Sequence, residues 1–201
     1  MSRLTVAIMA GGKSSRMGTD KSFVQIMGQP LIEQLRARLA DLGQAETILI
    51  TNRPADYAYL GLPMFTDVLP DKGSLGGIYT ALHYSSQPYT LIVACDMPFV
   101  SSPLLRYMID LCQNDQYDVI VPRVGGYPEG LHAIYGRSCL QPIHERLDNN
   151  ELRVITFYQQ MRVRYLDEAE CRPYDPHGLS FFNVNTPSEL ADAQRLAESD
   201  T

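Results

Sequence analysis

Two kinds of hydrophobic pattern alternate along this chain: short apolar runs and longer stretches with helical spacing. Apolar runs of strand length lie at residues 4–10, 46–51, 62–65, 89–94 and 118–122. Between the first two runs, apolar residues recur with helical spacing at Leu31, Ile32, Leu35, Leu39 and Leu42. Gly43 follows where such a helix commonly ends. Strand, helix and strand in this order predict a parallel βαβ unit with a right-handed crossover.

The rest of the chain continues this alternation less regularly. Ser74 is expected to cap a helix that runs through Tyr84, and Ser101 to begin another that ends near Asn114. A turn at 125–130 precedes a strand that is expected to pair antiparallel. Further elements are predicted as a strand at 131–135, helices at 140–147 and 152–160, strands at 162–166 and 181–185, and a helix at 187–197. The pattern therefore predicts an α/β protein.

Composition narrows the class of protein. With 201 residues, 45% of them hydrophobic, the chain can bury a sizeable core as one domain. A formal charge of -6 argues against non-specific nucleic-acid binding, which requires a basic face. The four cysteines are scattered without zinc-site spacing and indicate a reducing compartment. Because there is no signal segment and no apolar run near the ~20 residues that span a bilayer, we expect a soluble, cytoplasmic protein without membrane contact.

A glycine-containing, positively charged loop follows the first apolar run directly. It reads Gly11-Gly12-Lys13-Ser14-Ser15-Arg16-Met17-Gly18-Thr19-Asp20-Lys21. The glycines permit close backbone approach, the serines supply hydroxyl donors, and three cations fall within nine residues, so the loop is predicted to wrap a polyanion. Neither the Walker A spacing nor the dinucleotide fingerprint is present. The alternative is an ordinary basic connection between a strand and a helix.

Asp96 is the second candidate for chemistry. It closes the apolar run at 89–94, and in open α/β sheets ligands bind at the carboxyl ends of strands. An aspartate there could hold Mg²⁺ against a polyphosphate, since Mg²⁺ takes one or two carboxylates together with phosphate oxygens and water. The alternative is a turn aspartate that precedes Pro98.

Three motifs resemble one known family. The run Ala10-Gly11-Gly12-x-Ser14-x-Arg16-Met17-Gly18-x-Asp20-Lys21 resembles the signature loop of the sugar-phosphate-type nucleotidyltransferases, and most closely that of the molybdenum cofactor guanylyltransferases. Cys95-Asp96-Met97-Pro98 resembles the family's Asp-x-Pro metal motif, and Asn183-Val184-Asn185-Thr186-Pro187-Ser188-Glu189-Leu190 resembles its Asn-x-Asn-Thr-Pro-x-Glu-Leu ending. The likeness runs from about Leu4 to about Leu196. It implies one nucleotidyltransferase domain over residues 1–201, with a three-layer Rossmann-like fold, a mostly parallel sheet with an antiparallel strand, and helices on both faces.

The resemblance also implies a reaction and its residues. GMP would pass from Mg²⁺-GTP to the molybdopterin-bound molybdenum cofactor, giving molybdopterin guanine dinucleotide and pyrophosphate. Arg16, Lys21 and Asp96 would be catalytic, with Asp96 as the metal ligand. The GTP-binding residues would be Met9, Ala10, Gly11, Gly12, Ser14, Arg16, Lys21, Asn52, Asp67, Gly76 and Asp96. Glu129, Asn183 and Asn185 would lie on the acceptor side.

Several alternatives stay open at this point. A cytidylyltransferase that uses CTP is one rival, although the Gly11-Gly12 pair favours GTP because related cytidylyltransferases resemble Ala-Ala-Gly there. A non-catalytic module that binds a nucleotide or delivers the cofactor is another, with other cofactor-biosynthesis proteins and molybdoenzymes as partners. Asn52 and Asp67 could each be ordinary turn residues. Lys13 could equally be a solvent-exposed surface lysine. His132 is expected to be a packed or surface histidine rather than a catalytic one. Asn185 or Thr186 could equally cap the last helix.

Overall fold

The computed structural model describes residues 3–11, 21–112 and 116–199, and in these ranges eight strands form one sheet. Its order is β10-β7-β9-β6-β1-β4-β5, with β8 beside β7. The central strand β1 (Leu4–Met9) pairs in parallel with β4 (Glu46–Ile50) and with β6 (Tyr89–Ala94). A short fourth strand, β5 (Met64–Phe65), continues the parallel half beyond β4. The predicted parallel pairing of the first two runs is confirmed.

The other half of the sheet contains the antiparallel strand. β9 (His132–Gly136) runs antiparallel to β6 and to β7 (Val119–Val124), and β10 (Val163–Leu166) pairs in parallel with β7. The short strand β8 (Tyr127–Pro128) forms a hairpin with β7. The expected mostly parallel sheet with an antiparallel strand is therefore confirmed.

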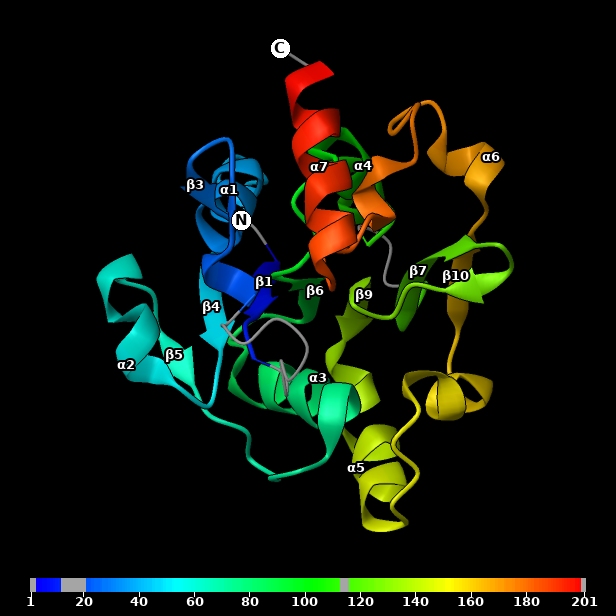
Figure 1. The fold of residues 1–201 in the computed structure, drawn as a ribbon. Helices are drawn as coiled ribbons and strands as arrows, with labels where there is room; N and C mark the ends of the chain where they lie inside the picture. Colours follow the sequence, from blue (N-terminus) through cyan, green and yellow to red (C-terminus); the bar gives the residue numbers. More distant parts are fainter. Residues whose placement is uncertain (1–2, 12–20, 113–115, 200–201) are drawn as a thin grey trace.

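Helices cover both faces of the sheet because the strands are apolar on both faces. In β1, Val6 and Ile8 are buried on the side of α1 (Leu31–Leu39) and α4 (Ser102–Asp110), whereas Ala7 is buried on the other side. That second face is covered by α3 (Gly73–Tyr84) and α5 (Leu140–Asp148). Figure 1 shows α1, α4 and α7 on one side of the sheet and α3 and α5 on the other. This arrangement is the three-layer fold that the resemblance implied.

The C-terminal helix packs against the part of the chain that follows the first loop. Helix α7 (Pro187–Ser199) packs against the hairpin of β2 (Gln25–Ile26) and β3 (Gln29–Pro30), which directly follows that loop. The described ranges contain no helix with the length and apolar character that crossing a membrane requires. The remaining short elements are η1 (Lys21–Phe23), α2 (Pro54–Tyr57), η2 (Ala58–Leu60), η3 (Arg137–Cys139), η4 (Val154–Gln160), α6 (Glu168–Cys171) and η5 (Leu179–Phe181).

Three local predictions differ from the structure. Ser74 does not cap α3, because Gly73 already lies in the helix at a φ of 60° and Lys72 precedes it as a cap without a side-chain bond. The predicted helix at 152–160 is a 3-10 helix that begins at Val154. No strand covers 181–185, since the structure gives this segment one backbone bond to the sheet edge, from Val184 N to the Asp96 carbonyl oxygen at 2.9 Å, instead of a ladder. By contrast, Ser101 caps α4 as predicted, accepting from Leu104 N at 3.3 Å.

Candidate active site

The carboxyl ends of three parallel strands meet at one edge of the sheet. Ala10 N donates to the Ile50 carbonyl oxygen at 2.9 Å, and Cys95 N donates to the Met9 carbonyl oxygen at 3.0 Å, so β1 ends between β4 and β6. Gly11 then turns away with a φ of 153°, a conformation that side chains disfavour. In an open α/β sheet this edge is the ordinary place for a ligand.

Asn52 and Asp67 form a reciprocal pair at this edge. Asn52 Nδ2 donates to Asp67 Oδ2 at 2.8 Å, and the Asp67 backbone N–H donates to Asn52 Oδ1 at 3.0 Å. The two residues lie 15 positions apart and follow neighbouring strands, β4 and β5. The structure thus brings together two predicted nucleotide contacts, and the pair fixes the orientation of both side chains.

The start of α3 approaches this pair through glycine. A Cβ on Gly77 would lie 2.2 Å from Met9 Cε and 3.9 Å from Asp67 Oδ1, so the absence of a side chain lets the helix lie against both. The predicted contact Gly76 faces Lys72 instead, where its Cβ would lie 2.6 Å from Lys72 Cβ. The two glycines are adjacent in the sequence, and of the two it is Gly77 that lies beside Met9.

Lys21, the first residue of η1, lies near enough to Asp96, just beyond β6, for their charges to interact. Burial raises the pKa of Asp96, the positive charge of Lys21 opposes that rise, and the negative charge of Glu189 adds to it. Lys21 Nζ also donates to Asn185 Oδ1 at 2.5 Å. An ammonium group, a carboxylate and an amide from three distant parts of the chain therefore share one location.

The C-terminal motif performs two tasks with different residues. Thr186 Oγ1 accepts from Glu189 N at 3.2 Å, and Glu189 Oε2 accepts from Asn185 N at 2.7 Å, which closes the start of α7 as in a capping box. Thr186 thus caps the helix and leaves the Asn185 side chain for Lys21. Asn183 Nδ2 donates elsewhere, to the Phe181 carbonyl oxygen at 3.3 Å. The premise that both asparagines sit on a strand is wrong, and their acceptor-side role stays a prediction.

Glu129 and His132 differ in their surroundings. Glu129 is half-buried, and burial raises the pKa of its carboxyl group. His132 is fully buried, and in the part of the chain that the structure describes neither ring nitrogen has a hydrogen-bond partner. Its ring makes an edge contact with Phe181, with centroids 5.2 Å apart, and burial lowers its pKa to about 4. His132 is therefore a packed histidine, as expected.

The remaining loop predictions lie outside the described residues. These are Gly12, Lys13, Ser14 and Arg16. Among the residues that the structure does describe, no group of three or more His, Cys, Asp and Glu side chains could enclose a metal. Asp96 alone at a ligand-binding edge fits Mg²⁺ that is held partly by the protein and partly by phosphate oxygens and water.

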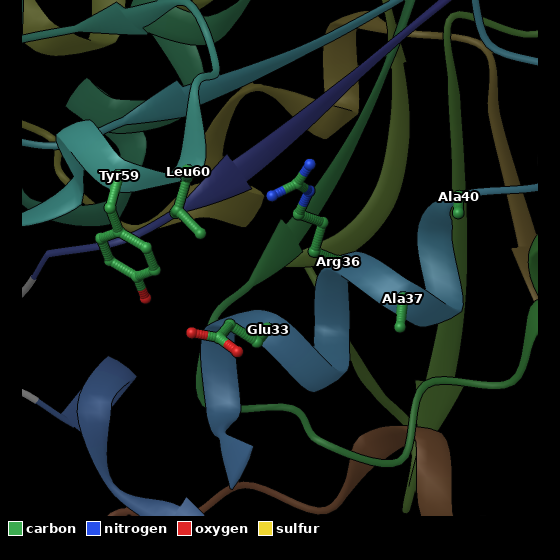
Figure 2. Close-up of a pocket in the computed structure, with 6 residues that line it drawn as sticks. All are labelled: Glu33, Arg36, Ala37, Ala40, Tyr59 and Leu60. Atoms are coloured by element: carbon green, nitrogen blue, oxygen red, sulfur yellow. The ribbon is translucent and has the colours of Figure 1, made fainter.

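A cavity of about 430 Å³ lies elsewhere, between α1 and η2. Figure 2 shows the Glu33 carboxylate and the Tyr59 ring facing across its opening, with Arg36 and Leu60 beside them. None of its lining residues is a predicted site residue. The chemistry is therefore assigned to the strand edge and not to this cavity.

Comparison with known proteins agrees with this geometry. Residues 6–163 match the family model described as a MobA-like NTP transferase domain. The chain belongs to this family. Among curated members, it is 37% identical to the "Probable molybdenum cofactor guanylyltransferase" of Pelotomaculum thermopropionicum, covering 99% of this chain and 96% of that one. It is 32% identical to the "Molybdenum cofactor guanylyltransferase" of Desulfosudis oleivorans, covering 96% of each chain.

A solved structure shows the same fold. Molybdopterin-guanine dinucleotide biosynthesis protein A from Archaeoglobus fulgidus superposes with a TM-score of 0.84 at 26% identity, covering 97% of this chain and 99% of that chain. Because the coverage is nearly complete in both chains, the likeness includes the C-terminal segment beyond residue 163 that the family model does not match.

Proposed function

We propose that this chain is a molybdenum cofactor guanylyltransferase. It transfers GMP from Mg²⁺-GTP to the molybdopterin-bound molybdenum cofactor and releases pyrophosphate, with residues 1–201 acting as one nucleotidyltransferase domain. The observation that carries the proposal is that Lys21, bonded to Asn185, lies near enough for its positive charge to act on Asp96 beyond the carboxyl end of β6. Relatives of 32% and 37% identity that bear this name over nearly the full chain support the choice of reaction.

In this reaction the protein contributes positioning and charge, and no general base is needed. A phosphate oxygen of the acceptor, already ionised at neutral pH, attacks the α-phosphorus of GTP. The bond from that phosphorus to the bridging oxygen of the β-phosphate breaks, and pyrophosphate leaves with the electron pair. In-line placement of the two phosphates and neutralisation of their charge are therefore the contributions to expect.

The site residues that the structure describes are assigned separate roles in this reaction. Lys21 supplies a positive charge to the phosphates, and Asn185 holds its ammonium group in place. Asp96 is the residue that would hold Mg²⁺, which neutralises phosphate oxygens when bound. The Asn52–Asp67 pair would contact the nucleoside, and Gly77 lets α3 lie closely against Met9. Arg16 is expected to add a second charge to the phosphates.

GTP is the proposed donor in preference to CTP. The Gly11-Gly12 pair and the names of the relatives support GTP. The deciding experiment incubates the purified protein and the molybdopterin cofactor with Mg²⁺ and either GTP or CTP, and measures pyrophosphate and the dinucleotide product. We expect product with GTP. Faster turnover with CTP would overturn the base assignment, and nucleotide binding without any pyrophosphate would favour the non-catalytic module.

Asp96→Asn is the variant for the metal role. The change removes the charge and keeps the shape, so we expect a loss of turnover of about a hundredfold or more, as for removal of a key electrostatic contact. The far-UV circular dichroism spectrum should be unchanged. An Asp96→Asn protein with normal turnover and a normal Mg²⁺ requirement would exclude Asp96 as the ligand.

We also propose the compartment, the substrates and the partners of the protein. All four cysteines are free and buried, which suits a reducing compartment such as the cytoplasm. GTP and the molybdopterin cofactor are the proposed substrates, and other cofactor-biosynthesis proteins and molybdoenzymes are proposed as partners. Co-elution of the protein with a molybdoenzyme in its cofactor-free form would test the last point.

A further inference from the structure

A buried thiol lies beside both ends of the first loop. Cys95 follows β6 and directly precedes Asp96. Its sulfur lies 3.0 Å from Ser22 Oγ, and the Gly11 backbone N–H is hydrogen-bonded to it. Gly11 comes directly after the first residue beyond β1, and Ser22 directly follows Lys21. One side chain therefore contacts the chain where the glycine-containing loop begins and again where it ends.

The contact continues into a second buried residue. Tyr57 OH donates to Ser22 Oγ at 2.9 Å, and the Tyr57 ring stacks on Phe23 with centroids 5.0 Å apart. Ser22 and Tyr57 are 0% exposed and Cys95 is 7% exposed. A buried hydroxyl that loses its partner is strongly unfavourable, and linked buried hydrogen bonds reinforce one another. The three side chains thus hold η1 against the end of β6.

Lys21 and Asp96 are also held by a second segment, residues 184–185. The Asp96 carbonyl oxygen accepts from Val184 N at 2.9 Å, and Lys21 Nζ donates to Asn185 Oδ1. Adjacent residues of one segment therefore hold Asp96 and Lys21. With the Cys95–Ser22 contact between their chain neighbours, the two residues are fixed relative to each other by two independent connections.

We propose that Cys95 is a positioning residue, whose thiol, together with Ser22 and Tyr57, sets the spacing of Lys21 from Asp96 and joins the two ends of the phosphate-binding loop. The role in turnover rests on the proposed function. The sequence presents Cys95 only as a core thiol at the end of an apolar strand. Its second role follows from its place between Gly11 and Ser22, which sequence periodicity does not reveal.

Activity measurements test the proposal with three variants and one control. Cys95→Ala, Ser22→Ala and Tyr57→Phe each remove one member of the hydrogen-bonded set. Misplacement of reacting groups by a fraction of an ångström to one ångström lowers rates by about tenfold to a hundredfold, and we expect a fall of kcat in this range with a smaller change in the KM for GTP. The Mg²⁺ concentration for half-maximal rate should rise. Cys95→Ser keeps a hydrogen-bonding group and should recover part of the loss seen in Cys95→Ala.

The control is Cys171→Ala. Cys171 is also buried, and the one hydrogen bond that the structure gives its sulfur within the described residues is to the Leu166 carbonyl oxygen, at 3.9 Å. This variant should lose stability without a change in kcat or in the Mg²⁺ requirement. If the three test variants behave like Cys171→Ala, the thiol is only a packing group and the proposal is overturned.

Amide hydrogen exchange gives a measure that does not depend on turnover. In Tyr57→Phe, the mildest variant, exchange should accelerate at Gly11, at 21–23 and at 95–97 together, while the amides of β4 keep their protection. Acceleration at 21–23 alone, or equally across the whole sheet, would refute the connection. If the wild-type protein makes no dinucleotide but its Tyr57→Phe variant shows the joint acceleration, the proposed function is refuted and the positioning role of Cys95 within the fold is retained.

Discussion

Lys21 Nζ donates to Asn185 Oδ1 across 164 positions of sequence. The bond joins the end of the first loop to the segment before α7, and it places the ammonium group beside Asp96. An ammonium group on a long side chain has many conformations in solvent, and an amide oxygen that accepts from it selects one. The relationship therefore predicts that Asn185 acts on turnover through Lys21.

Asn185→Ala should lower kcat with little loss of stability. Losing a hydrogen bond to a charged group corresponds to about 1.5 kcal/mol, so the expected fall is about tenfold. Pyrophosphate release measures it. The matched control is Asn183→Ala, because Asn183 bonds only to the Phe181 carbonyl oxygen among the partners given within the described residues. A larger defect in Asn183→Ala than in Asn185→Ala would contradict this assignment.

Gly77→Ala should impair nucleotide binding more than folding. The new Cβ would lie 2.2 Å from Met9 Cε, so the flexible end of the Met9 side chain would have to move. We expect a higher KM for GTP with an unchanged circular dichroism spectrum. The double variant Met9→Ala with Gly77→Ala should restore part of the binding. An unaltered KM for GTP in Gly77→Ala would show that the nucleotide does not contact the site near Gly77 and Met9.

Because His132 is buried, we expect the folded protein to lose stability in mild acid. Burial lowers its pKa in the folded protein to about 4, against about 6.5 in an unfolded chain. Between these values the unfolded state binds more protons, so the free energy of unfolding falls as the pH falls. Integrated over the window, the loss is about 3 kcal/mol.

Urea unfolding of His132→Phe at pH 7 and pH 4.5 measures this contribution. The variant should lose less stability between the two pH values than the wild type does. His177→Gln, a change at an exposed histidine, should leave the difference unchanged. Equal acid sensitivity in His132→Phe and in the wild type would show that another group is responsible.

We expect Asp118 to make a second acid-sensitive contribution to the stability of the fold, at lower pH. Arg162 donates to Asp118 through Nε and Nη2, both at 2.8 Å, and through its backbone N–H at 3.0 Å. These bonds hold the pKa of Asp118 well below its usual range, although burial opposes them. A depressed carboxyl pKa stabilises the fold above the unfolded-state value near 4, and this stabilisation is lost as the pH falls further.

Asp118→Asn should lower the free energy of unfolding at pH 7 by about 2 kcal/mol, since it leaves the three Arg162 donors with a weaker, uncharged acceptor. Thermal unfolding at pH 7 and at pH 3 measures the effect, and the difference between variant and wild type should shrink at pH 3. Asp167→Asn is the control, because Asp167 pairs with Arg123 in a largely exposed position, where ion pairs contribute little. A deficit that stays constant with pH would contradict the role of the Asp118 charge.

Much of the fold could be predicted because its signals are local. The apolar run of β1 and the helical spacing of α1 both gave elements within a few residues of the observed bounds. The start of α3 could not be predicted correctly, because a positive φ at Gly73 moved it ahead of Ser74. The predicted strand at 181–185 is absent, because whether a segment becomes a strand depends on a partner that the sequence does not show.

The sequence by itself determined the order of strands and helices, the two apolar faces of β1, and the family through its motifs, since each depends on residues that are neighbours along the chain. Only the tertiary structure decided which side chains meet at the strand edge. Asn52 faces Asp67, Gly77 rather than Gly76 lies beside Met9, and Cys95 contacts both ends of the first loop. Such contacts arise when the sheet order and the packing of α3 and α7 bring distant segments together, and no local period encodes that order.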